Sequence, residues 1–215
     1  MANLIGIAGE PGSGKSTSLK GLPADHTVIF DCDGKGLNWK GWKQQYNSGK
    51  NNYFRINEPE KVIKGLHSVA TSDKFKHVNY VVIDTVNNLM VSEEMRRCRE
   101  KGYDKWMDLA QYIWNLVEMP GMFRENLTVI LVFHTQTERT EDGYERIRIK
   151  TNGRKTEKND IDSKFNWLLR SVKQGDQYLF EVASHNSTSR TPLGAFEEEY
   201  IPNDIMRVLE IMKEY

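Results

Sequence analysis

The residues "GEPGSGKST" (9–17) combine glycines, a lysine and hydroxyl side chains at the spacing of a phosphate-binding loop. Four residues separate Gly9 from Gly14, and Lys15 and Ser16 follow directly. Glycines let the backbone point successive N–H groups at one anion, and a helix N-terminus adds partial positive charge. The run "LIGIA" predicts a buried strand before the loop, and "KSTSLKGL" predicts the start of a helix after it. We therefore expect this loop to bind the phosphates of a nucleotide.

The polar residues of the loop have distinct expected roles. Lys15 should reach the β and γ phosphates, and the Ser16 hydroxyl should ligate Mg²⁺. Thr17 should lie beside the α-phosphate. The expected cofactor-binding residues are Gly9, Gly12, Ser13, Gly14, Lys15, Ser16 and Thr17.

A second anchor for Mg²⁺ is predicted at the end of the apolar run "YVVIDT". We expect this strand to lie beside the strand of the loop, with Asp84 holding Mg²⁺ through water and Thr85 supporting the geometry. Taken alone, Asp84 could be an aspartate that merely ends a strand. The phosphate-binding loop favours the metal role and pairs Asp84 with Ser16.

Another strand, within "TVIFDCDGKG", also ends in carboxylates. A carboxylate at the end of a strand neighbouring the loop can orient and deprotonate a water in line with the γ-phosphate. Asp33 is the first candidate for this catalytic acid and Asp31 is the second. Either residue could instead cap the turn at Gly34, which is a common role of aspartate.

A fourth strand, within "VILVFHTQTE", ends in polar residues where a γ-phosphate sensor would lie. His134 and Gln136 could each hydrogen-bond that phosphate or the attacking water. A histidine at a strand end can also be a purely structural hydrogen-bonding group. We therefore add both residues to the candidate catalytic set of Lys15, Asp33 and Asp84.

Strand-like and helical patterns alternate along the chain, which predicts an α/β fold with a mainly parallel sheet flanked by helices. The run "EPEKVIKGLHSVATS" predicts a crossover helix, and a longer helical pattern extends from about Val91 to Glu118, closed by Pro120 and Gly121. Residues 137–164 are polar and predict a long loop. The strand-like segments are "LIGIAG", "TVIFDCD", "YFRI", "VNYVVIDT", "LTVILVFHT" and "YLFEVA".

Composition narrows the class of protein only in part. A length of 215 residues predicts one domain over 1–215, and 30 basic residues cancel 30 acidic ones. The two cysteines, Cys32 and Cys98, have no metal-type spacing. So few cysteines fit a protein of the reducing cytoplasm. No apolar run approaches the roughly 20 residues that cross a bilayer. We expect a soluble cytoplasmic protein with no membrane partner.

The order of these motifs resembles that of RecA-like P-loop ATPases: "GEPGSGKST", "FDCDG", "VVIDTVNNL" and then "VFHTQ". More narrowly, the chain is similar to short phage-encoded ATPases linked to single-strand annealing and recombination. In these, an ending like "TSRTPLGAFEEEYIPNDIMRVLEIM" forms a final strand, an "IP" pair and a last helix. The resemblance covers nearly the whole chain and implies ATP, Mg²⁺ and the cytoplasm of a bacterial host. Recombinases usually carry glutamate where this chain has Asp33, which implies slow hydrolysis.

In RecA-like proteins the loop after the fourth strand approaches DNA, so the resemblance implies a single-stranded DNA partner. Phosphate attraction by a basic segment would be salt-dependent, although the acidic run "TERTEDGYE" before it leaves an ordinary solvated loop as the alternative. Tyr144, Phe165 and Trp167 are candidates for base stacking, whereas Trp39 and Trp42 should pack against the sheet edge. The basic residues of 146–173 are Arg146, Arg148, Lys150, Arg154, Lys155, Lys158, Lys164, Arg170 and Lys173.

Arg190, in "STSRTPLG", could serve as an arginine finger across a subunit interface of a homo-oligomer, or could simply be solvated. The function predicted from these features is an ATPase that acts on single-stranded DNA in recombination or replication, with phage or host recombination proteins as possible partners. One alternative is a nucleotide or small-molecule kinase. Another is a nucleotide-gated binding factor with little turnover.

Overall fold

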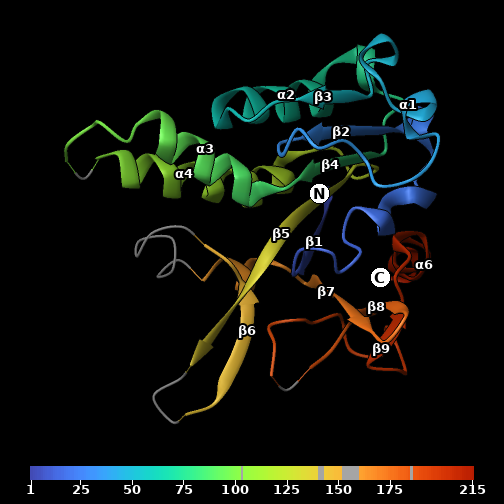
Figure 1. Cartoon of the computed structure of the whole chain (residues 1–215). Helices are drawn as coiled ribbons and strands as arrows, with labels where there is room; N and C mark the ends of the chain where they lie inside the picture. The colour runs from blue at the N-terminus through green and yellow to red at the C-terminus, as the bar shows by residue number, and fades with distance from the viewer. Residues whose placement is uncertain (103, 140–142, 152–159, 185) are drawn as a thin grey trace.

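A computed structural model describes residues 1–102, 104–139, 143–151, 160–184 and 186–215. These residues form a nine-stranded sheet in the order β3-β2-β4-β5-β1-β7-β8-β9, with β6 paired to β5 (Figure 1). The strands are β1 (Asn3–Gly9), β2 (Thr27–Asp31), β3 (Tyr53–Arg55), β4 (Tyr80–Asp84), β5 (Thr128–Arg139), β6 (Glu145–Ile149), β7 (Trp167–Gln174), β8 (Gln177–Glu181) and β9 (Tyr200–Pro202).

The sheet is mixed and mainly parallel. Every neighbouring pair from β3 to β7 in the spatial order is parallel, whereas β8 is antiparallel to β7 and β9, and β6 is antiparallel to β5. Parallel neighbours need crossover connections, which place helices on the faces of the sheet. The predicted α/β class is confirmed.

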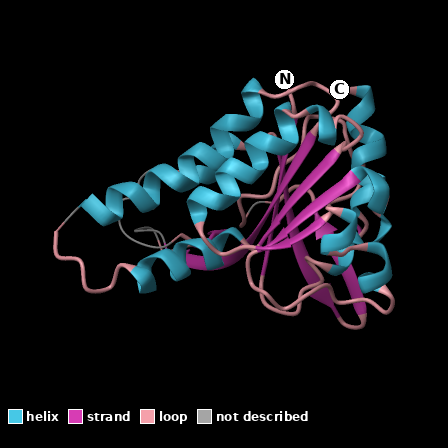
Figure 2. Cartoon of the chain, turned by 90° about the horizontal axis from the view of Figure 1, so that it is seen from above, coloured by secondary structure: helices cyan, strands magenta, loops and turns pink. Residues whose placement is uncertain are grey.

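Helices cover both faces of the sheet (Figure 2). Val129, Leu131 and Phe133 of β5 share one apolar cluster with residues of α2, α3 and α4. Ile130 and Val132 point the other way, into a cluster with α6. β5 therefore has the continuous apolar sequence of a strand that is buried on both faces. The helices of the described residues are α1 (Trp42–Gln45), α2 (Pro59–Thr71), α3 (Val86–Arg96), α4 (Asp104–Glu118) and α6 (Ile205–Ile211).

One helical pattern was predicted from about Val91 to Glu118, whereas the structure has two helices there, α3 and α4. Residues 97–102 between them, "RCREKG", offer one small apolar side chain and several like charges, so no apolar face continues through them. Gly102 is left-handed with φ of +111° and interrupts the helical backbone. Pro120 and Gly121 lie in the 3₁₀ turn that follows α4, as expected.

The α-helix predicted after the phosphate-binding loop is replaced by a short 3₁₀ helix, η1 (Thr17–Gly21). The 3₁₀ helix ends at Gly21 and Pro23 comes two residues later, and both residue types disfavour a longer helix. A Cβ atom built on Gly21 would lie 2.9 Å from Cγ of Met206, so α6 packs closely against the end of η1.

The long loop predicted at 137–164 is partly wrong. β5 continues to Arg139 and pairs with β6, and the two strands project from the body of the molecule as a hairpin (Figure 1). The alternating sequence "ERIRI" of β6 is typical of a strand with one exposed face. Ile147 N donates to Asn186 O (2.8 Å) and Ile149 N donates to the Asp162 carboxylate (3.0 Å), and these hydrogen bonds fix the hairpin to the body.

The strand order corrects a further expectation. The acidic strands β2 and β4 were both expected beside β1, but β5 lies between β1 and β4, and β2 lies beyond β4. A crossover connection does not have to join neighbouring strands, so the order along the chain leaves the order in space open. The final strand β9, with Ile201 and Pro202, followed by the helix α6 agrees with the expected ending.

Among the described residues, no helix combines the length and the apolar character required to span a membrane.

Candidate nucleotide-binding site

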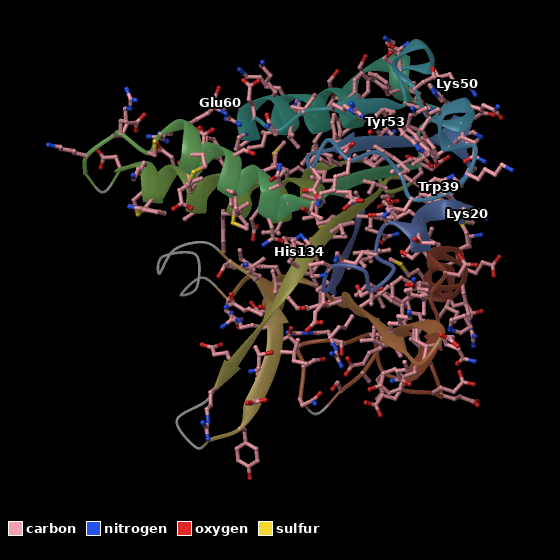
Figure 3. All side chains as sticks on the ribbon, viewed as in Figure 1. Lys20, Trp39, Lys50, Tyr53, Glu60 and His134 are labelled. Atoms are coloured by element: carbon pink, nitrogen blue, oxygen red, sulfur yellow. The ribbon has the colours of Figure 1, made fainter. Side chains whose placement is uncertain are left out.

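The predicted site residues meet at the carboxyl ends of the parallel strands. Gly9 at the end of β1 is in register with His134 of β5, and Asp31 at the end of β2 is in register with Asp84 at the end of β4. The carboxyl edge of a parallel sheet is where ligands bind in open α/β folds. Figure 3 shows His134 near the middle of the molecule, close to where the β5–β6 hairpin leaves the body.

The loop of residues 9–17 has the backbone that its glycines permit. Gly12 and Gly14 are left-handed, with φ of +80° and +100°. Two distant side chains hold the loop from outside: Ser171 Oγ donates to Ser13 O (2.8 Å), and Asn203 Nδ2 donates to Gly14 O (3.0 Å). Sequence reasoning missed Ser171 and Asn203, because each is an isolated polar residue far along the chain with no motif around it.

Lys15 is buried within the loop, 6 % exposed. Its Nζ donates to Gly9 O (2.9 Å) and Glu10 O (2.7 Å). Burial lowers the pKa of Lys15 to about 8, although the carboxylates of Asp84 and Asp33 act in the opposite direction. A bound phosphate could therefore replace these two backbone carbonyls as the hydrogen-bond partner of the Lys15 ammonium group.

Ser16 and Asp84, which the sequence paired as anchors of Mg²⁺, are in direct contact. Ser16 Oγ donates to Asp84 Oδ2 at 2.6 Å. Burial raises the pKa of Asp84 to about 6, with the negative charges of Asp33 and Asp31 adding to the rise and the Ser16 hydroxyl and Lys15 opposing it. Magnesium prefers hydroxyl and carboxylate oxygens and is commonly bound by one or two carboxylates together with phosphates. The pair fits Mg²⁺ by its chemistry, and a bound cation would relieve the cost of the buried carboxylate.

Asp31 and Asp33 have different surroundings. Asp31 is buried and accepts from Gly34 N (2.7 Å), from Gly36 N (2.9 Å) and from the Tyr53 hydroxyl. This is the capping role that sequence reasoning left open for either acid. Asp33 is half-buried and remains the candidate catalytic acid.

Thr85 contacts Asp33, whereas the sequence placed it in support of Asp84. Thr85 Oγ1 donates to Asp33 Oδ1 (2.9 Å), and Lys35 Nζ contacts Asp33 Oδ2 (2.8 Å). These two contacts fix the orientation of the Asp33 carboxylate. The Asp33 carboxylate in turn raises the pKa of Lys35.

His134 lies at the site, and Gln136 lies farther along β5, in the hairpin opposite Arg148. His134 Nδ1 is buried without a hydrogen-bond partner among the described residues. Burial, followed by the charge of Lys15, lowers the pKa of His134, which favours the neutral form of its ring. A neutral imidazole nitrogen without a partner can hydrogen-bond to a ligand or to a water.

Asn87 is a third residue that the sequence did not reveal. Its Oδ1 accepts from His134 N (2.7 Å), and its Nδ2 donates to Lys150 O (2.7 Å). Lys150 N in turn donates to His134 O (2.8 Å). The first turn of α3, just after Asp84, is therefore bonded to both strands at the base of the β5–β6 hairpin.

Three of the six described basic residues of 146–173 form ion pairs within the chain. Arg148 contacts Glu138 (3.0 Å) and Asp162 (3.4 Å). Arg170 pairs with the buried Glu181, and Lys164 pairs with Glu118 (2.7 Å). Arg146, Lys150 and Lys173 are exposed, and Arg154, Lys155 and Lys158 lie outside the described residues. Within the described part of this segment, the basic surface is thus smaller than the sequence indicated.

The prediction of base stacking is wrong for two of its three candidate residues. Phe165 and Trp167 are buried in the core, and Phe165 packs edge-on against Phe133. Tyr144, on the hairpin, is 75 % exposed. Trp39 is buried and Trp42 packs on Tyr53 of β3, which confirms the expected packing at the sheet edge; Figure 3 shows Trp39 and Tyr53 there.

Arg190 lies in a segment that pairs with β7. Arg190 N donates to Leu168 O (2.8 Å), and Leu168 N donates to Arg190 O (2.9 Å). The guanidinium Nε contacts Thr188 O at 3.4 Å. The trans role of Arg190 stays a prediction.

Comparison with known proteins gives one family. Residues 1–191 match the family model described as an AAA domain. The matched range includes the phosphate-binding loop, the ends of β2 and β4, and the β5–β6 hairpin. A search of curated proteins finds no match.

Proposed function

Because the chain belongs to the AAA-domain family of P-loop NTPases, we propose that it is a Mg²⁺-dependent ATPase that acts on single-stranded DNA in recombination or replication. The contact between Ser16 Oγ and Asp84 Oδ2 carries the nucleotide part of this proposal. It joins the loop to the acidic strand over 68 residues of sequence, at 2.6 Å. The DNA part is supported by the resemblance to phage-type RecA-like ATPases and by the exposed Arg146 and Lys150 of the hairpin.

Each residue of the site has a role in hydrolysis under this proposal. The loop N–H groups and Lys15 hold the phosphates, and Ser16 and Asp84 hold Mg²⁺, which supplies charge neutralisation when bound. Asp33, oriented by Thr85, accepts a proton from the attacking water. The neutral His134 ring hydrogen-bonds to the γ-phosphate or to that water.

Phosphate release, measured with Mg²⁺ and ATP and with or without single-stranded DNA, tests the proposal. We expect turnover that rises with DNA, and a stimulation that weakens steeply as salt is raised. Transfer of phosphate to an added nucleotide or small-molecule acceptor would support the kinase instead. Tight ATP binding without turnover under any condition would support the nucleotide-gated binding factor.

The lowered pKa of Lys15 predicts that ATP binding takes up protons between about pH 8 and pH 9. In the free protein the Lys15 amine is partly neutral in this range, and the phosphate charges favour its ammonium form. Affinity should accordingly decline as the pH rises above about 8. Calorimetry in two buffers of different ionisation enthalpy measures the uptake. A Lys15→Arg variant that still binds should show no such uptake, because guanidinium does not titrate in this range; equal uptake in the variant would contradict the assignment.

Asp84→Asn should weaken Mg²⁺-dependent ATP binding, because an amide cannot supply the charge of a carboxylate. In the wild-type protein the Mg²⁺-dependent affinity should fall as the pH drops through about 6, where Asp84 becomes protonated, and the variant should lack this fall. Thermal stability at neutral pH should not decrease, because the raised pKa means that the folded state bears the cost of a buried charge. Titrations of ATP with and without Mg²⁺ provide the measurement. An unchanged Mg²⁺ dependence would make Asp84 only a strand end.

A further inference from the structure

The side chain of Tyr178, on β8, lies directly against the phosphate-binding loop. A Cβ atom built on Gly14 would lie 2.9 Å from Cδ1 of Tyr178 and 2.5 Å from Nδ2 of Asn203, so only a glycine at position 14 admits both side chains. Asn203 fixes this arrangement, because its backbone N donates to Tyr178 O (3.2 Å) and its Nδ2 donates to Gly14 O (3.0 Å). The ring is thus positioned by the loop and by the turn after β9.

The strand order gives the direction in which a nucleotide leaves the loop. Asp33, Asp84 and His134 lie on or just after β2, β4 and β5, which are all on one side of β1 in the sheet. Tyr178 belongs to β8, and this strand lies on the other side of β1, beyond β7 (Figure 1). Because Ser16 and Asp84 mark the magnesium end, the sugar and base must extend away from them. Thr17 begins η1, and Leu19 of η1 shares an apolar cluster with Phe180 of β8, so this direction leads toward the flank formed by β7 and β8.

The Tyr178 ring has the exposure that a stacking residue requires. Its side chain belongs to a residue that is 44 % exposed, and the Lys173 ammonium lies 5.4 Å from the ring centroid. Lys173 is itself exposed, so a flat ligand can take its place over the ring. Stacking on an aromatic side chain is tolerant of base identity, because every base has a π-face.

We infer that Tyr178 stacks on the base of the bound nucleotide and that Asn203 positions it for this purpose. The inference rests on the proposed nucleotide binding. It places the sugar and base, which the loop does not hold, beside β8. Removal of the ring should lower ATP affinity by about 5- to 150-fold, the range found for single base-stacking contacts. The affinity for a ligand that carries only the phosphates should not change.

The test compares ATP with inorganic tripolyphosphate, which carries the phosphates but no sugar or base. Equilibrium affinities are measured for the wild-type protein and for Tyr178→Ala, Tyr178→Leu and Tyr178→Phe, with Tyr112→Ala on α4 as a tyrosine removed far from the loop. Circular dichroism checks that each variant is folded, and Tyr178→Leu retains apolar bulk against Gly14. We expect weaker ATP binding by the Ala and Leu variants, unchanged tripolyphosphate binding, and wild-type behaviour of the Phe and Tyr112 variants.

The outcomes separate this inference from the proposed function. If the Ala and Leu variants bind ATP as the wild-type protein does, the base lies elsewhere and the inference is overturned. If ATP and tripolyphosphate lose affinity equally, Tyr178 shapes the loop and does not contact the base, which also overturns it. If the wild-type protein binds neither ligand, the nucleotide-binding proposal itself fails.

Discussion

Lys15→Ala should bind ATP at least about 100-fold more weakly than the wild-type protein and lose turnover, while remaining folded. The expected loss follows from two charge-assisted hydrogen bonds to phosphate, each contributing about 1.5–3 kcal/mol. The fold should persist because the Lys15 ammonium donates to the backbone carbonyls of Gly9 and Glu10 and, within the described part of the chain, hydrogen-bonds to no side chain. Equilibrium ATP binding, phosphate release and thermal unfolding together measure the effect.

A matched control for this variant is Lys20→Ala. Lys20 is an exposed lysine in η1, five positions after Lys15 (Figure 3). It is close in sequence and equal in charge, so the loss of a nearby positive charge alone should show in both variants. Near-wild-type turnover by Lys15→Ala, or an equal loss in Lys20→Ala, would remove the support for the assigned loop.

Asp33→Asn should retain ATP affinity and lose turnover by about 10²- to 10⁴-fold, the usual contribution of a general base. An amide at this position can still accept from Thr85 Oγ1, so the local geometry should be kept. What it loses is the ability to accept a proton from water. Single-turnover hydrolysis measured beside equilibrium binding separates the two effects.

Asp31→Asn is the comparison for this variant. This substitution should reduce turnover less than Asp33→Asn does. The thermal stability of the variant should fall, because the Asp31 carboxylate accepts hydrogen bonds from two backbone N–H groups and from the Tyr53 hydroxyl. Normal hydrolysis by Asp33→Asn would move the catalytic role to another acid. Loss of both affinity and turnover would mean that Asp33 shapes the pocket.

Features that depend on neighbouring residues could be predicted from the sequence. The loop, the apolar strands and the acids at their ends are set by local composition, and the Ser16–Asp84 contact follows once both strands join one parallel sheet. The sequence indicated that one of Asp31 and Asp33 could cap the turn and the other could be the catalytic acid, but it did not assign these two roles. That assignment depends on Tyr53 of β3 and on the Thr85 hydroxyl, which come from other parts of the chain.

Features that depend on distant packing could not be predicted. The position of β5 between β1 and β4 depends on which crossover is made, and the sequence pattern is the same for either order. Phe165 and Trp167 follow a polar basic segment and were interpreted as surface residues, but the core covers both. Ser171, Asn203 and Asn87 act through hydrogen bonds to distant parts of the chain, which leave no periodicity or motif behind.

The Asn87 side chain has a consequence for how the two proposed ligands affect one another. It connects the helix that begins beside Asp84 to both strands at the base of the hairpin, through His134 N and Lys150 O. Movement of the hairpin relative to α3 must therefore break or shift these bonds. Under the proposed function, thermodynamic linkage requires that any factor by which nucleotide changes the affinity for DNA equals the factor by which DNA changes the affinity for nucleotide.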